Sequence, residues 1–158
     1  MPKIKNIPLL IGLILLCEGA GIIGSLFTFS SIPTWYASLN KPIFSPPNWI
    51  FGPVWTTLYA LMGISLYLVI SDKRKVIRKK ALIVFGIQLL LNTTWSIVFF
   101  GLRDPLLALV NIILLWTAIL FTIKYFYKIN KFAGNLLIPY ILWVSFAALL
   151  NLAIVLLN

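Results

Sequence analysis

The sequence has no histidine and only three acidic residues, Glu18, Asp72 and Asp104. Metal sites built on histidine or on paired carboxylates are therefore excluded, as are catalytic triads with a histidine base. The single cysteine, Cys17, cannot form a disulfide within the chain, so we expect it to pack as a small apolar side chain. Charged residues make up only 10% of the 158 residues, against 61% hydrophobic residues. This composition indicates a membrane protein without ordinary acid–base machinery.

Five apolar stretches are each long enough to cross a bilayer, which takes roughly 20 helical residues. They cover residues 7–29, 48–70, 81–102, 105–126 and 132–157, and Glu18 is the one acidic residue inside them. Backbone groups in lipid must be hydrogen-bonded internally, which favours helices. The sequence therefore predicts an all-α integral membrane protein, with residues 1–158 forming a single bundle of five transmembrane helices.

Positive charge is concentrated on one side of this predicted bundle. The cations on the side of the N-terminus are Lys3, Lys5, Lys73, Arg74, Lys75, Arg78, Lys79, Lys80, Lys124, Lys128 and Lys131. Only Lys41 and Arg103 fall on the opposite side. The positive-inside rule then predicts a multi-pass protein of the cell membrane with a cytoplasmic N-terminus and an extracytoplasmic C-terminus. The basic run at residues 73–80 is explained by contact with anionic lipid, and we expect no nucleic-acid partner.

The connection at residues 30–47 is longer than the others and holds four prolines, Pro33, Pro42, Pro46 and Pro47. A long, stiff loop between otherwise tightly joined helices is a candidate lid. Asp104 before Pro105, and Ser45 before Pro46, are each typical of an N-cap followed by the first helical residue.

Glu18 is an ionisable group within a predicted span, which marks it as a functional candidate. Two interpretations are open. It is either a carboxylate that relays protons or pairs with a ligand, or a protonated structural residue that is hydrogen-bonded inside the bundle.

Three predicted helices carry polar and aromatic residues at helical spacing. The sets are Trp55, Tyr59 and Met62; Gln88, Asn92 and Trp95; and Tyr140, Trp143, Ala147 and Asn151. Amides facing lipid are costly, so these faces should point into the bundle. Spacing alone fits either a ligand pocket or a dry core held together by polar contacts.

Residues 35–63 read WYASLNKPIFSPPNWIFGPVWTTLYALMG. This segment closely resembles the signature of the tryptophan-rich sensory protein and mitochondrial translocator protein family, once called peripheral benzodiazepine receptors. The matching residues are Trp35, Tyr36, Leu39, Lys41, Pro42, Pro46, Pro47, Phe51, Val54, Trp55, Leu58, Tyr59, Met62 and Gly63. The likeness continues at Gln88, Asn92, Trp95 and Ser96 and through residues 139–151.

The resemblance implies a bundle of five transmembrane helices, usually a homodimer, with one pocket beneath the first loop. Family members bind porphyrins, notably protoporphyrin IX, and isoquinoline carboxamide or benzodiazepine-type ligands. Some bacterial members promote light-dependent oxidative degradation of protoporphyrin IX. No permanently bound cofactor is implied, since protoporphyrin is the ligand or substrate and light and oxygen drive its turnover.

Carried over by position, the resemblance also implies the residues of this pocket. They are Tyr36, Phe51, Trp55, Gln88, Asn92, Trp95, Trp143, Ala147 and Leu150. We expect Lys41, with Arg103 as second choice, to meet the porphyrin propionates at the mouth. Indole is the most readily oxidised aromatic side chain, so Trp55 and Trp143 are the expected catalytic residues. Animal members follow the segment matching Asn151 with a cholesterol motif that contains a Tyr and an Arg. This chain reads NLAIVLLN there, which does not support specific cholesterol binding.

Two further functional classes stay open at the level of the sequence. The protein could be a carrier or stress sensor for porphyrin or another small amphiphile, without catalysis. A purely structural membrane partner is the third class, and it would show no saturable porphyrin binding.

Overall fold

The computed structural model describes residues 6–72 and 75–158, without the side chains of residues 75 and 76. Lys3, Lys5, Lys73 and Arg74, which contribute to the predicted orientation, lie outside the described residues. The α-helices are α1 (Ile7–Ser31), α2 (Phe51–Ile70), α3 (Lys75–Ser96), α4 (Pro105–Ile129), α5 (Lys131–Leu136) and α6 (Ile138–Leu157). Two π-helical segments, η1 (Ile32–Tyr36) and η3 (Ile97–Gly101), extend α1 and α3, and a 3₁₀ turn, η2 (Asn48–Ile50), precedes α2.

Within the described ranges, five helical segments are long and apolar enough to cross a membrane. They are Ile7–Tyr36, Asn48–Ile70, Ile77–Gly101, Pro105–Ile129 and Lys131–Leu157. The prediction of an all-α bundle of five transmembrane helices is confirmed.

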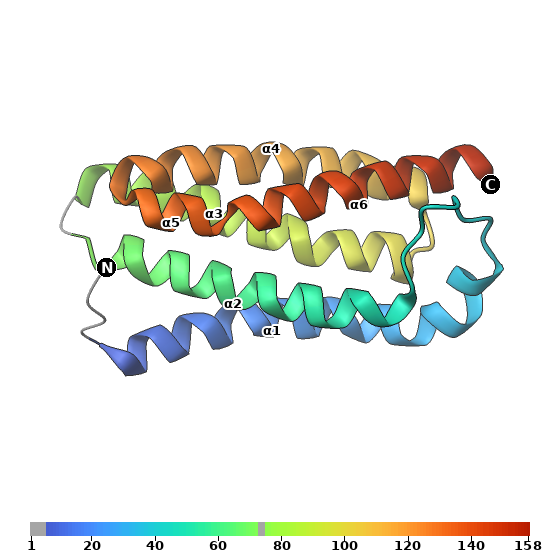
Figure 1. Cartoon of the computed structure of the whole chain (residues 1–158), viewed down its shortest axis with the longest axis horizontal. Helices are drawn as coiled ribbons and strands as arrows, with labels where there is room; N and C mark the ends of the chain where they lie inside the picture. Colours follow the sequence, from blue (N-terminus) through green and yellow to red (C-terminus); the bar gives the residue numbers. More distant parts are fainter. Residues whose placement is uncertain (1–5, 73–74) are drawn as a thin grey trace.

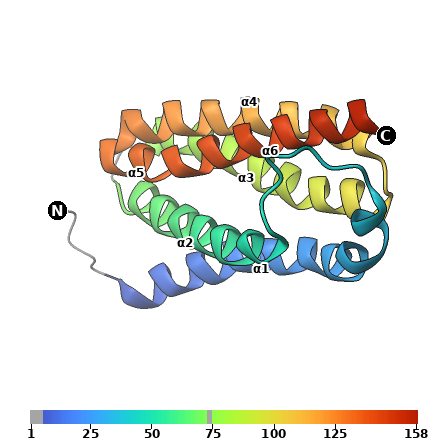
Figure 2. The same ribbon diagram turned by 45° about the vertical axis from the view of Figure 1, so that its right-hand side comes forward.

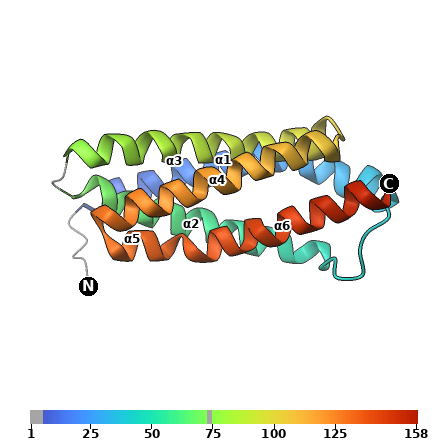
Figure 3. The same cartoon turned by 90° about the horizontal axis from the view of Figure 1, so that it is seen from above.

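The helices run side by side along the long axis of the molecule (Figure 1). α1 packs on α2, and α3 packs on α4 (Figures 1 and 2). Because α3 also contacts α1, it lies between α1 on one side and α4 on the other. α6 packs along α4, while α5 closes the ring by contacting α2 (Figure 3). The connection from α1 to α2 crosses the end of the bundle where the C-terminus lies, and we call this the loop end.

The helix boundaries correct the predicted lid at residues 30–47. Helix continues through the π-helical segment Ile32–Tyr36 and to residue 38, so the non-helical connection covers only residues 39–47. Pro33 lacks an N–H and cannot make the usual helical bond, and a π-helical turn accommodates it without ending the helix. The predicted third span, 81–102, likewise begins earlier, at Lys75. The predicted span 132–157 is divided at Leu137, because Pro139 cannot donate a hydrogen bond to the preceding turn.

Side-chain caps fix the starts of three helices, α1, α4 and α5, the last through Asn130. Asp104 accepts a hydrogen bond from the Leu107 backbone N–H at 2.9 Å, which confirms its predicted role as N-cap of α4. Asn6 does the same for α1 through the Leu9 N–H at 3.1 Å. The N-cap prediction for Ser45 is wrong. Its own N–H bonds to the Pro42 carbonyl at 3.0 Å in a loop turn, and helix begins only after Pro47.

α1 and α2 come very close at Gly63. A Cβ atom there would lie 2.5 Å from the Ile14 Cα, so only glycine permits this approach. Further along, the Tyr59 ring lies directly over Gly21 in the same way. These two contacts hold the helices together below the loop end.

Candidate ligand-binding site

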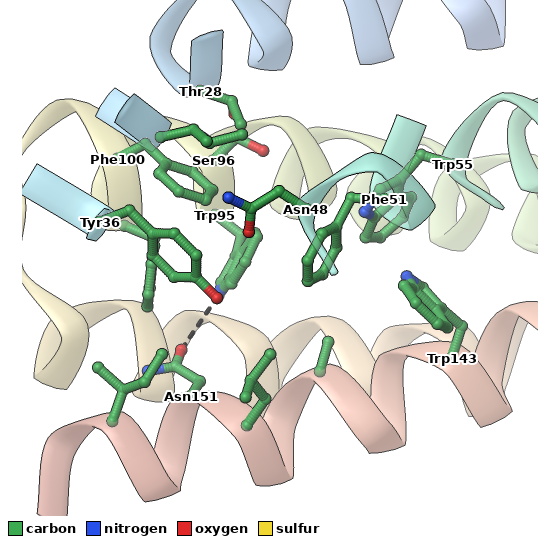
Figure 4. Close-up of a pocket in the computed structure, with 15 residues that line it drawn as sticks. Thr28, Tyr36, Asn48, Phe51, Trp55, Trp95, Ser96, Phe100, Trp143 and Asn151 are labelled. Carbon is green, nitrogen blue, oxygen red and sulfur yellow. Dashed lines mark hydrogen bonds between the residues drawn. The ribbon is translucent and has the colours of Figure 1, made fainter. Parts of the chain in front are cut away.

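A cavity lies inside the bundle near the loop end (Figure 4). Its walls come from α1 with η1, from η2 with α2, from α3 with η3, and from α6. The lining residues are Thr28, Ile32, Tyr36, Asn48, Phe51, Trp55, Trp95, Ser96, Phe99, Phe100, Trp143, Ala147, Leu150, Asn151 and Ile154. None of these wall residues is charged, and the described residues contain no group of three or more His, Cys, Asp or Glu side chains that could hold a metal ion.

Aromatic rings form most of the wall and are gathered at its two ends. Phe51, Trp55 and Trp143 lie at one end of the cavity, and Tyr36 and Trp95 at the other (Figure 4). The rings of Phe51 and Trp143 meet edge to face, with centroids 5.9 Å apart. At the other end Trp95 stacks on Phe99 at 5.1 Å. Such walls suit a flat, conjugated ligand, because ring faces stack and ring edges take T-shaped contacts.

The two π-helical segments both contribute to this cavity. η1 supplies Ile32 and Tyr36, and η3 supplies Phe99 and Phe100. The Ser31 hydroxyl donates to the Phe100 carbonyl at 2.8 Å, which joins the two segments and satisfies a carbonyl within the widened turn. π-helical turns often occur at functional sites, where they redirect side chains relative to a regular helix.

One buried polar atom at the cavity has no partner. Among the described residues, Trp143 Nε1 and Asn111 Oδ1 are the buried side-chain polar atoms that make no hydrogen bond. Another indole donor at the cavity, Trp95 Nε1, bonds to Asn151 Oδ1 at 3.2 Å, and the Asn151 amide donates in turn to the Pro105 carbonyl at 2.8 Å. An unpaired buried donor is costly, so the Trp143 N–H is the natural position for an acceptor on a ligand.

The structure does not place Gln88 and Asn92 in the cavity wall. Both are buried beneath it in a hydrogen-bonded network with two tyrosines. Tyr59 donates to Asn92, Asn92 donates to the Tyr140 hydroxyl at 2.8 Å, and Tyr140 donates to Gln88 Oε1 at 2.8 Å. Trp55 lies between this network and the cavity, with its ring 5.7 Å from the Tyr59 ring and 6.3 Å from the Tyr140 ring. The predicted amides therefore form the floor that supports Trp55.

Lys41 is also outside the cavity wall. Its Nζ donates to the carbonyls of Tyr36 at 2.9 Å, Leu39 at 3.0 Å and Ala37 at 3.3 Å. An ammonium has three donors, so these bonds use all of them. Lys41 thus caps the end of the first span, a place where a cation is favoured by the helix dipole, and does not reach toward a ligand.

The free volume of the cavity is about 80 Å³. Pockets that bury drug-sized ligands enclose roughly 300–1,000 Å³, so a large ligand requires this cavity to expand. A groove of about 490 Å³ between α1 and α2 lies directly beside it. The cavity and the groove share the residues Thr28, Ile32, Asn48, Phe51, Trp55 and Ser96. Rotamer changes along this shared wall would enlarge the cavity toward the groove.

The structure therefore brings one part of the predicted site together around a single cavity: Tyr36, Phe51, Trp55, Trp95, Trp143, Ala147 and Leu150. Lining residues that the sequence prediction missed are Thr28, Ile32, Asn48, Ser96, Phe99, Phe100, Asn151 and Ile154. Asn151 could have been included, since it continues the face of Trp143 and Ala147. Phe99 and Phe100 gave no such signal, because the π-helical turn that directs them does not follow regular helical spacing.

Comparison with known proteins agrees with this architecture. The TspO/MBR family matches residues 13–157. The chain is 50% identical over 154 residues to the tryptophan-rich protein TspO of Archaeoglobus fulgidus, covering 97% of this chain and 99% of that protein. It is 43% identical over 159 residues to the protein of the same name from Chlorobaculum tepidum, covering 99% and 98%. It is 39% identical over 132 residues to the translocator protein of Homo sapiens, covering 82% and 78%. The chain belongs to the TspO/MBR family.

Proposed function

We propose that this membrane protein binds a tetrapyrrole, protoporphyrin IX, in the aromatic cavity and promotes its light-dependent oxidative degradation. The observation that carries the proposal is the cavity itself, where aromatic rings from several helices surround the unpaired Trp143 N–H. Flat conjugated ligands stack on such rings, and isoquinoline carboxamide or benzodiazepine-type ligands share that shape together with a hydrogen-bond acceptor.

Different residues around the cavity would contact different parts of the ligand. Trp55 and Trp143 at one end and Trp95 at the other would stack on the macrocycle, while the Trp143 N–H would donate to an acceptor on it. The propionates would lie toward the loop end, where Asn48 is exposed. Lys41 would not pair with them, because its ammonium is already bonded to backbone carbonyls. Ala147 leaves room for close approach of the ring.

In the photochemical step, dioxygen is the oxidant and the bound tetrapyrrole, once excited by light, is the group that is oxidised. The role proposed for Trp55 and Trp143 is to pass an electron reversibly to the excited ring and to recover it from the ring, so that the indoles are not consumed and the electrons lost by the tetrapyrrole go to dioxygen. This chain has no histidine and no paired carboxylates that could act in their place.

The hydrogen-bonded floor of the cavity favours a protein that binds and converts its ligand, and not one that carries the ligand across the membrane. A carrier needs access from both faces of the membrane, but the network of Tyr59, Asn92, Tyr140 and Gln88 fills the bundle beneath Trp55. Tyr140 and Gln88 are each 1% exposed, so this region leaves no open path. A ligand would therefore enter and leave at the loop-end half.

The proposal also includes the arrangement in the membrane. We infer a cytoplasmic N-terminus and an extracytoplasmic C-terminus from the distribution of lysine and arginine, and a homodimer from the family resemblance.

Titration of the purified protein with protoporphyrin IX, first in the dark and then under light in air, tests the proposal. We expect saturable binding in the dark and conversion to a new product under light. Trp55→Phe combined with Trp143→Phe should bind somewhat more weakly and lose the conversion, because phenylalanine keeps the ring but not the indole. Trp116→Phe is the matched control, since Trp116 bonds to Ser145 away from the cavity. Wild-type conversion by the saturated double variant would refute the indole role, and non-saturable binding would refute the site.

A further inference from the structure

The groove between α1 and α2 has features that the aromatic cavity lacks. It follows one stripe of each helix, and its outer rim carries Ile22, Phe29 and Trp49, which are 62%, 74% and 73% exposed. In a membrane-spanning bundle these side chains face lipid. From Glu18 to Ile32 the groove runs along about 21 Å of α1. It is therefore a lipid-facing groove long enough to hold an extended hydrocarbon chain.

Glu18 lines the inner end of this groove. It lies about 17 Å along the first span from Ile7, near the middle of the bilayer. In the part of the chain that the structure describes, its carboxyl group makes no hydrogen bond and no ion pair. An acidic group at that depth is costly unless it faces a partner, which makes the absence of one informative.

The neighbouring hydroxyls do not serve as that partner. Tyr59, which also lines the groove, donates its proton to Asn92. Ser25 donates to the Ile22 carbonyl at 2.7 Å and Thr28 to the Gly24 carbonyl at 3.2 Å, both within α1. The interpretation of Glu18 as a hydrogen-bonded structural residue therefore finds no support among these contacts.

We infer that the α1–α2 groove is a second ligand site, which takes a cationic amphiphile from the bilayer and pairs its ammonium group with Glu18. Charge selects this class, because Glu18 is the one acidic residue within the spans of a chain with a net charge of +10. The hydrocarbon tail lies along the rim formed by Ile22, Phe29 and Trp49. The groove adjoins the proposed tetrapyrrole site and shares a wall with it, but Glu18 lines the groove and not the cavity, and it would repel the propionates of a tetrapyrrole. The inference does not depend on that proposal.

Dodecylamine, with dodecanol as its uncharged analogue, is the direct probe. Bound ligand is counted by native mass spectrometry of the protein in a non-ionic detergent, and affinity is measured by calorimetry. We expect one dodecylamine per chain at concentrations where dodecanol is not retained. Glu18→Gln should weaken dodecylamine binding at least about tenfold, as expected for loss of a poorly hydrated ion pair, and leave dodecanol unchanged.

Two further variants test the place of binding. Gly52 lines the groove but not the cavity, and a Cβ atom there meets nothing within 4 Å, so the side chain of Gly52→Leu starts in open space and would occupy part of the groove. It should also weaken dodecylamine binding. Asp104→Asn is the matched control, because it removes one negative charge elsewhere while asparagine keeps the N-cap. Equal retention of dodecylamine and dodecanol, or undiminished amine binding in Glu18→Gln or in Gly52→Leu, would overturn the inference.

Discussion

Asn158 and Asn40 bind each other at the loop end of the bundle. Asn158 Oδ1 accepts from the Asn40 backbone N–H at 2.9 Å, and Asn158 Nδ2 donates to the Asn40 carbonyl at 3.1 Å. The Asn40 side chain adds a bond to the Leu157 carbonyl at 3.3 Å. The last turn of α6 thus holds the connection between the first two spans in place, next to the cavity lined by Tyr36 and Asn48.

Asn158→Ala should speed ligand exchange more than it changes affinity. Without the paired bonds, the connection at residues 39–47 opens more often, so both association and dissociation rates of protoporphyrin rise about tenfold to thirtyfold, since the two lost bonds are worth about 1 kcal/mol each. Stopped-flow fluorescence measures both rates. Asn158→Asp keeps the acceptor and loses the donor, so its rates should fall between the two. Rates equal to wild type in both variants would show that this contact does not govern exchange.

Ala147→Thr should weaken binding of protoporphyrin and of an isoquinoline carboxamide by about tenfold, while folding is retained. Ala147 lines the cavity and is 7% exposed, so a β-branched side chain enters space that a planar ligand needs. Equilibrium titration gives the two dissociation constants. Ala148→Thr makes the same change one residue along α6, outside the cavity wall, and should bind like wild type. Unchanged constants in Ala147→Thr would argue that the ligand lies elsewhere.

Tyr140→Phe should lower the free energy of unfolding by about 2 kcal/mol, because it removes one hydroxyl that serves two buried partners. Asn92 Nδ2 loses its acceptor and Gln88 Oε1 loses its donor. Reversible denaturation in detergent measures the change. Tyr127→Phe is the control, since Tyr127 is 45% exposed, and it should change stability little. A neutral Tyr140→Phe would mean that water or a rearranged amide replaces the hydroxyl.

Gly63→Ala should destabilise the packing of α1 on α2 by about 1–3 kcal/mol, as overpacking does in other cores. The added Cβ would lie 2.5 Å from the Ile14 Cα, a backbone atom that cannot move by a rotamer change. Gly86→Ala, where nothing lies within 4 Å, should be neutral or stabilising by up to about 1 kcal/mol. Thermal denaturation of both variants checks the contrast. Equal melting temperatures would contradict the close approach.

Labelling of introduced cysteines should report the proposed orientation. In a Cys17→Ser background, Phe44→Cys should react with a membrane-impermeant maleimide in intact cells, whereas Lys79→Cys should react only after permeabilisation. Both positions are exposed, so access depends on the side of the membrane. The reverse pattern would place the N-terminus outside.

Hydropathy and helical spacing were sufficient to predict the five spans and the inward faces that carry Trp55, Trp95 and Trp143. Each of these signals is local and periodic, so a single sequence contains it. The same signals could not predict which inward-facing polar residues line the cavity wall and which lie in the floor beneath it. Gln88 and Trp95 share a face of α3, yet Gln88 lies in the floor and Trp95 in the wall, because the partners on α2 and α6 decide which space is filled.

The role of Lys41 could not be predicted for a different reason. Its position beside the prolines fitted a lid with a free cation, but the first span continues to Tyr36 and leaves carbonyls at its end within reach of the ammonium. That outcome depends on the π-helical turn at Pro33, which allows helix to persist where proline usually ends it.

The network beneath Trp55 has a consequence for a membrane that stores energy as a proton gradient. Two phenols lie at its core, and chains of hydroxyls can pass protons across a bilayer. Here the Asn92 amide stands between Tyr59 and Tyr140, and the Gln88 amide follows Tyr140. A carboxamide accepts and donates hydrogen bonds through different atoms, and it does not exchange a proton between them as water or a carboxyl group does. We therefore expect this network to hold its two hydroxyl groups deep in the membrane without passing protons along it.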